Sequence, residues 1–164
     1  MTGATNASPS STSVDPAGLG LALARICIGT MFVWVFFENY GKGYYSPGPY
    51  ADLIQYYIDK GGAPAVWKSV MALAAAHARV AAPMQGVSEI SFGVLLVLGL
   101  FTRPVALAAG AFLTSLWISE WDTGWIWELL VPVWTTFSLA VGAAGRHWGL
   151  DARFARKYPH SLLW

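Results

Sequence analysis

The chain has 164 residues, of which 55% are hydrophobic and only 12% are charged, and its formal net charge is +1. An average soluble domain carries about 25% charged residues, and so short a chain cannot bury this much apolar surface away from water. We therefore predict an all-α integral membrane protein whose first partner is the lipid bilayer. The net charge gives no reason to expect nucleic-acid binding, because no basic stripe is present.

The N-terminal segment is predicted to be a polar tail that covers residues 1–17. It is rich in Ser, Thr, Ala and Pro up to Asp15 and contains no Lys or Arg. A secretory signal would need a positive start followed by a short apolar core. We therefore expect a cytoplasmic tail, then a membrane domain over residues 18–151 and a basic tail over residues 152–164.

Four apolar stretches are predicted to cross the bilayer as helices and to pack as a four-helix bundle. They cover residues 19–37, 84–101, 105–119 and 125–144. A spanning helix needs about 20 apolar residues, and the third stretch reaches that length only with its flank through Trp121. The first stretch holds the one cysteine, Cys27, which we interpret as a small apolar residue. Neither an internal disulfide nor a metal site is predicted.

The long connection between the first two spans also carries helical patterns. Residues 49–60 begin with Pro49, end before Gly61 and place apolar side chains on one side, as in an amphipathic helix suited to the membrane surface. Residues 64–82 repeat apolar positions at a helical period, and we expect that helix to kink at Pro83 into the second span. Residues 102–104 and 122–124 are predicted to be tight turns, with Pro104 starting the third span.

Basic residues predict the orientation in a bacterial-type inner membrane. The side that holds both termini also carries Arg103, Arg146, Arg153, Arg156 and Lys157. Positive residues near spans favour the cytoplasm, so we expect both termini there. Aromatic side chains gather at the opposite end, at Trp34, Tyr40, Tyr44, Tyr45, Trp117, Trp121, Trp125 and Trp127. Anchoring at the headgroup level is the favoured interpretation of these rings, and a quinone or pigment site is the alternative.

Charges inside the spans are the most informative residues, because each costs at least ~2.5 kcal/mol near the bilayer centre unless it turns inward. Arg25, Glu89 and Glu128 each lie on a helical face of small or polar residues, which lets helices approach closely. We expect these faces to meet at the bundle axis. An inner group that acts as a structural clamp comprises Arg25, Arg103, Arg146 and Asp151.

An outer acidic cluster of Glu38, Glu89, Glu120 and Glu128 is open to a functional or a structural interpretation. Carboxylates brought together raise at least one pKa and could share protons or receive a cationic or quinol ligand. The catalytic candidates are Glu38, Glu89 and Glu128, and the candidates for cofactor binding are Trp34, Tyr44 and His77. None of His77, His147 and His160 lies within a predicted span, which excludes bis-histidine haem, and packing or a hydrogen bond is the simpler role for His77.

Two segments resemble a known family. Residues 99–106 (GLFTRPVA) look like the "GLFTR" turn of DoxX-like membrane proteins, and residues 142–151 (GAAGRHWGLD) are similar to their "GAGR…LD" ending. Arg25 and Glu89 match the arginine of the first helix and the acidic residue of the second. Residues 38–47 (ENYGKGYYSP) and 63–68 (APAVWK) resemble the DoxD branch, which includes the membrane subunit of thiosulfate:quinone oxidoreductase. The resemblance implies four helices and, for that branch, electron transfer to quinone with a soluble DoxA-like partner.

Three functions remain open at this point. The favoured one is an accessory or structural subunit of a multi-subunit respiratory or photosynthetic electron-transport complex, because the chain is small and carries no redox cofactor motif. The second is a DoxD-like subunit of a quinone-linked oxidoreductase, with the acidic cluster and Trp34 or Tyr44 at the site. The third is a small transporter. Other membrane protein subunits are expected partners, and quinone, lipid or pigment are the possible bound molecules.

Overall fold

The computed structural model describes residues 15–161 and 163–164, so most of the predicted polar tail lies outside the described residues. These residues form helices and no strand, which confirms the all-α prediction. The elements are α1 (Pro16–Gly41), α2 (Pro47–Lys60), α3 (Ala65–Ala76), α4 (Ala78–Leu98), α5 (Thr102–Ser119), α6 (Ile126–Val141), the 3-10 helix η1 (Ala144–Arg146) and α7 (Asp151–Lys157).

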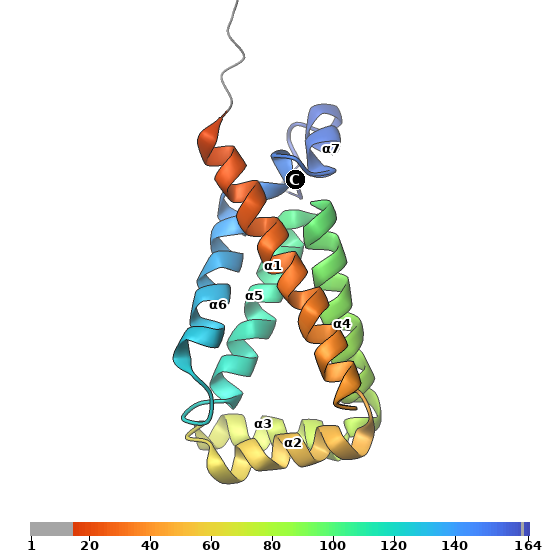
Figure 1. Ribbon diagram of the computed structural model, residues 1–164, viewed down its shortest axis with the longest axis vertical. Helices are drawn as coiled ribbons and strands as arrows, with labels where there is room; N and C mark the ends of the chain where they lie inside the picture. Colours follow the sequence, from red (N-terminus) through yellow and green to blue (C-terminus); the bar gives the residue numbers. More distant parts are fainter. Residues whose placement is uncertain (1–14, 162) are drawn as a thin grey trace, which may run out of the picture.

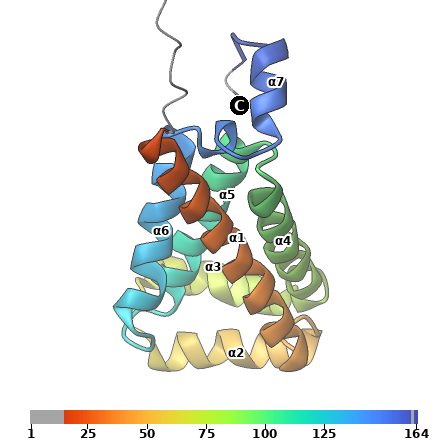
Figure 2. The ribbon, with the colours of Figure 1, turned by 45° about the horizontal axis from the view of Figure 1, so that its top comes forward.

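Four helices run along the long axis of the molecule, and the others cover its two ends (Figure 1). Helices α1, α4, α5 and α6 form the long part, with α2 and α3 lying across one end and η1 and α7 at the other. Helix α1 is inclined, so that its start lies near α6 and its end near α4 in both views (Figure 2). Its main neighbour is α4, while α5 packs mainly on α6. The space between these two pairs is therefore widest at the end covered by α2 and α3.

Among the described residues, two helices are long and apolar enough to cross a membrane by length and composition. They are α1, with 26 residues, and α4, with 21 residues. Helices α5 and α6 correspond to the third and fourth predicted spans and, at 18 and 16 residues, are shorter than α1 and α4. The fourth ends earlier than predicted because Ala143 takes a left-handed conformation, with φ of 47°, and Ala144–Arg146 tightens into η1.

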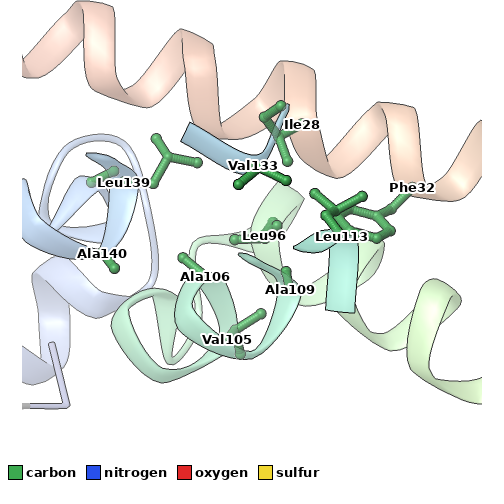
Figure 3. Close-up of a cluster of buried hydrophobic side chains, with 11 residues drawn as sticks. Ile28, Phe32, Leu96, Val105, Ala106, Ala109, Leu113, Val133, Leu139 and Ala140 are labelled. Atoms are coloured by element: carbon green, nitrogen blue, oxygen red, sulfur yellow. The ribbon is translucent and has the colours of Figure 1, made fainter. Parts of the chain in front are cut away.

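The core lies where the four long helices meet (Figure 3). Its buried side chains come from each of them: Ile28 and Phe32 from α1, Leu96 from α4, Val105, Ala106, Ala109 and Leu113 from α5, and Val133, Leu139 and Ala140 from α6. The rings of Phe32 and Phe92 meet edge to face at 5.6 Å between centroids, and those of Phe92 and Phe112 at 5.7 Å. Such edge contacts add stabilisation beyond burial.

The connection before α4 differs from the prediction. The amphipathic helix is confirmed as α2, which ends at Lys60 as expected. The predicted kink at Pro83 is wrong, because the chain turns at His77, with φ of −107° and ψ of 28°, and Pro83 lies inside α4. The direction must change where the crosswise α3 meets the lengthwise α4, whereas Pro83 removes a single hydrogen-bond donor on an exposed face.

The turn between α4 and α5 is also displaced from its predicted position. Helix α5 begins at Thr102, so Pro104 lies in its first turn, where backbone N–H groups have no partner within the helix. The turn itself consists of residues 99–101, with Gly99 and Phe101 in left-handed conformations at φ of 65° and 51°. The second predicted turn is confirmed, since the amide of Thr123 donates to the carbonyl of Glu120 at 2.9 Å.

Candidate functional site

Arg25 joins three segments at the end of the molecule that carries η1 and α7. Its side chain is fully buried. The guanidinium donates to the carbonyls of Leu96 at 2.5 Å and Val97 at 3.0 Å, in the last turn of α4. It also donates to the carbonyls of Trp148 at 3.1 Å and His147 at 3.4 Å. A cation at a helix C-terminus satisfies carbonyls that have no partner within the helix, so Arg25 holds α1, α4 and the η1–α7 connection together.

Asp151 completes this junction from the other side. Its carboxylate accepts the amides of Phe101 and Thr102, both at 2.8 Å, and so caps the N-terminus of α5. The backbone at residue 99 lies so close to that at residue 149 that only glycine fits, since a Cβ on Gly99 would lie 2.7 Å from the Cα of Gly149. The two motifs over residues 99–106 and 142–151 therefore meet in one buried junction.

The other two residues of the predicted inner group lie apart from that junction. Arg103 donates from Nε to the carbonyl of Ala140 at 3.2 Å and links α5 to α6. Arg146 is exposed, and its guanidinium donates to the main-chain oxygen of Trp164 at 2.6 Å. Arg25 and Asp151 are thus the two buried charges at this end of the described chain.

A partly open cavity of about 670 Å³ lies at the opposite end, and residues of α1, α2, α3, α4, α5 and α6 line it. All four residues of the predicted outer acidic cluster line it, namely Glu38, Glu89, Glu120 and Glu128. Most of the remaining lining is apolar or aromatic. Its exposed lining residues fall into two groups: Glu38, Lys42 and Glu128 on the side of α1 and α6, and Val70 and Met84 on the side of α3 and α4.

Glu89 is the buried carboxylate of this cavity, with 1% of its surface exposed. Its oxygens accept hydrogen bonds from the hydroxyl of Tyr45, from Nε2 of Gln85 at 2.9 Å and from Nδ2 of Asn39 at 3.2 Å. All three donors are neutral, and no described residue forms an ion pair with Glu89. The ring of Tyr45 packs against Gly86, where a Cβ would stand 3.0 Å from the ring.

Sequence reasoning placed Glu89 on an inward face but missed its three donors. Gln85 could have been found from its spacing, because it lies four residues before Glu89 on the same helix. Asn39 and Tyr45 carry no such signal. They reach Glu89 because the chain folds back after α1, where the amide of Tyr44 donates to the carbonyl of Asn39 at 3.0 Å.

Glu120 is half-buried and accepts a hydrogen bond from the hydroxyl of Tyr57 at 3.2 Å. Burial raises the pKa of the Glu120 carboxyl; the Tyr57 hydrogen bond lowers this pKa, and the nearby charge of Glu128 raises it further. Burial and the charge of Glu120 likewise raise the pKa of the Tyr57 phenol. Glu128 is exposed in the first turn of α6.

The four carboxylates therefore share a cavity without pairing with one another. Glu38 binds Lys42 at 2.5 Å, and both side chains are about half exposed, at 49% and 50%. Hydrogen bonding to Glu38 raises the pKa of Lys42. An exposed pair of this kind adds little stability.

The predicted cofactor-binding residues are divided by the structure. Tyr44 lines the cavity, whereas Trp34 and His77 do not. Trp34 is 72% exposed. His77 is exposed, and its Nδ1 lies 3.0 Å from the carbonyl of Leu73, a contact at the C-terminus of α3. Of the three candidates, Tyr44 alone is placed where a ligand in this cavity would touch it.

Comparison with known proteins identifies the family to which this chain belongs. The family model for DoxX matches residues 20–119, which contain Arg25 and two residues of the acidic cluster, Glu38 and Glu89. No curated protein and no solved structure matches the chain significantly. The matched segment covers more than half of the chain and includes all of α4 and most of α1, the two described helices that are long and apolar enough to cross a membrane. The chain therefore belongs to the DoxX family of membrane proteins.

Proposed function

We propose that this chain is a four-helix membrane subunit of an electron-transport assembly and binds a quinone headgroup in its large cavity. The observation that carries the proposal is Glu89, a buried carboxylate in a mostly apolar cavity, held by neutral donors. A buried charge without a cation is costly, so its retention suits a group that must hold or pass a proton.

The cavity fits a quinone in size and chemistry. Ligand cavities commonly measure about 300–1,000 Å³ and combine an apolar wall with a few convergent polar groups, as the cavity of about 670 Å³ does. The amides of Asn39 and Gln85 could donate to a ring carbonyl. A carboxylate has about four acceptor sites, so the three donors leave Glu89 room for a ligand hydroxyl.

The ligand would supply the redox chemistry, and the chain's own residues would orient the ring and hold the proton at Glu89. Val70 of α3 and Met84 of α4 are exposed apolar residues of the cavity lining, and a lipid tail could leave the cavity beside them. Helix α2, amphipathic and crosswise, would lie in the membrane surface below it.

The proposed topology has four spans and both termini in the cytoplasm of a bacterial-type inner membrane. At 1.5 Å per residue, α5 and α6 reach ~27 Å and ~24 Å, close to the ~30 Å hydrocarbon layer. Arg103, Arg153, Arg156 and Lys157 belong to the end with α7, which favours the cytoplasm for that end. The cavity would then face the opposite side.

Ligand binding to the purified protein tests the proposal. We expect decylubiquinone to bind saturably in lipid nanodiscs and Glu89→Gln to weaken binding by about tenfold or more, because a hydrogen bond to a charged group contributes about 1.5–3 kcal/mol. Asp52→Asn, on the exposed side of α2, is the matched control and should leave binding unchanged. Absence of saturable binding, or equal weakening by both variants, would rule out the site.

An accessory structural role is the second candidate, and the Arg25–Asp151 junction favours it, because those buried charges bind main-chain groups that join helices. Purification from native membranes in mild detergent separates the two roles. A large complex whose turnover is unaffected by Glu89→Gln supports the accessory role. A small complex that reduces quinone with thiosulfate and stops on Glu89→Gln supports the DoxD-like enzyme.

A further inference from the structure

A second cavity, of about 230 Å³, lies beside the turn between α5 and α6. Three tryptophans line it, Trp117, Trp121 and Trp125, together with the carboxylates of Glu120 and Asp122. The rings of Trp117 and Trp121 lie 5.4 Å apart between centroids with 31° between their planes. Trp125 lines the cavity from the start of α6, on the other side of the turn.

The charge of this cavity is negative. Glu120 receives a hydrogen bond from the neutral Tyr57, and the ion pairs of residues 15–161 and 163–164 involve neither Glu120 nor Asp122. The described protein therefore supplies two carboxylates and three indole rings to one small space and no cation to balance them. The turn is held in place by the amide of Gly62, which donates to the carbonyl of Trp121 at 2.8 Å.

We propose that this cavity binds an alkylated ammonium group of the trimethylammonium class. The face of an indole ring attracts a cation within about 6 Å, and tryptophan is the strongest such ring. An alkylated ammonium is weakly hydrated and has an apolar surface, so it gains from the rings as well as from the carboxylates. A primary ammonium is strongly hydrated and loses more on leaving water.

The position of the cavity leaves two sources for this group. Trp121 and Trp125 are 43% and 74% exposed, at the end of the molecule that the proposed topology places at the level of the lipid headgroups. The ligand is therefore either the choline headgroup of a lipid or a free solute such as choline. This cavity shares Glu120 and Leu129 with the larger cavity of the proposed quinone site, whereas its three tryptophans line the smaller cavity and not the larger one.

Calorimetric titration of the full chain with choline tests the proposal. The protein is placed in nanodiscs of phosphatidylglycerol, which carries no ammonium group. The comparison ligand is the uncharged isostere of choline in which a tert-butyl group replaces trimethylammonium. We expect saturable binding of choline and none of the isostere. Equal binding of the two, or no saturable binding of choline, would overturn the proposal.

Variants distinguish a specific cage, formed by Trp117, Trp121 and Trp125, from general binding to the aromatic residues at this end of the molecule. Trp121→Leu should weaken choline binding about two- to fivefold, and Trp121→Phe, which keeps a weaker ring and the fold, should lie between it and the wild type. Trp127→Leu is the matched control, because Trp127 is 64% exposed at the same end of α6 and lines neither cavity. Equal loss in Trp127→Leu would contradict a specific cage.

A change of lipid then identifies the source. Replacing a fifth of the phosphatidylglycerol by phosphatidylcholine should lower the apparent affinity for free choline if the lipid headgroup occupies the cavity. An unchanged affinity assigns the cavity to a soluble trimethylammonium compound. Both results support the binding chemistry and differ in the ligand that carries it.

Discussion

Two glycines of α1 make opposite predictions for the same substitution. Gly20 is exposed, and a Cβ there would meet nothing within 4 Å. Replacing glycine by alanine inside a helix stabilises the folded state by about 0.5–1 kcal/mol when space allows. At Gly29 a Cβ would lie 2.8 Å from the backbone nitrogen of Val97 and 2.9 Å from the carbonyl oxygen of Gly93, whereas ordinary contacts fall at 3.4–4 Å.

The obstacle at Gly29 is the backbone of α4, which cannot rotate away as a side chain can. Helices α1 and α4 must separate by a few tenths of an ångström along their shared contact, and overpacking of this kind costs about 1–3 kcal/mol. Both substitutions gain the same helix propensity, so we expect Gly29→Ala to be less stable than Gly20→Ala by about 1–3 kcal/mol.

Thermal unfolding in mild detergent, followed by far-ultraviolet circular dichroism, measures this difference. For a chain of this size each kcal/mol shifts Tm by about 2–4 °C, so Gly29→Ala should melt visibly below Gly20→Ala. Both variants keep the helix and its charge, which makes each the control for the other. Equal melting temperatures would show that the two helices are not in backbone contact at Gly29.

Three further predictions concern the buried polar groups. Arg25→Met should lower the free energy of unfolding by about 3–5 kcal/mol, because it leaves Asp151 and several carbonyls without their cation, while exposed Arg153→Met should change it by less than about 0.5 kcal/mol in the same denaturation assay. Tyr45→Phe should cost about 1–3 kcal/mol by removing a donor to buried Glu89, and a loss no larger than the scatter of exposed variants would contradict that contact. The pKa of Glu120 is raised in the folded state, so the contribution of Glu120 to stability is full below the ordinary glutamate pKa and disappears as pH rises through the raised value. The free energy of unfolding, measured at a series of pH values, should therefore fall more steeply above pH ~4.3 for the wild type than for Glu120→Gln.

The helices were predictable because their signals are local. Apolar length indicates α1 and α4, and small residues around Arg25 and Glu89 indicate the faces that pack inward. The turn at His77 was not predictable from the chain, because proline is the stronger local signal and the actual break depends on the direction that α4 must take. The sequence pattern therefore predicts that a helix forms, but the position at which the chain changes direction depends on the helices that pack against it.

The two motif segments could be recognised from the sequence, but their contact in the folded structure could not be predicted from it. Residues 99–106 and 142–151 are separated by two helices, and only the pairing of α5 with α6 brings their glycines together. The contacts of Asn39 and Tyr45 with Glu89 were not predicted for the same reason, since they depend on a loop that folds back after α1. Partners distant in sequence need the tertiary structure.

The two ends of the molecule treat buried charge differently, and this difference separates structure from function. Arg25 is bound to main-chain carbonyls, which cannot be redirected without moving the helices that carry them. Glu89 is bound to side-chain donors, which can change rotamer and turn toward a ligand at little cost to the fold. A carboxylate with exchangeable donors beside a cavity can therefore accept a new partner, whereas a cation fixed by backbone groups cannot. This contrast supports the proposal that a ligand binds at the end with Glu89, while the end with Arg25 serves helix packing.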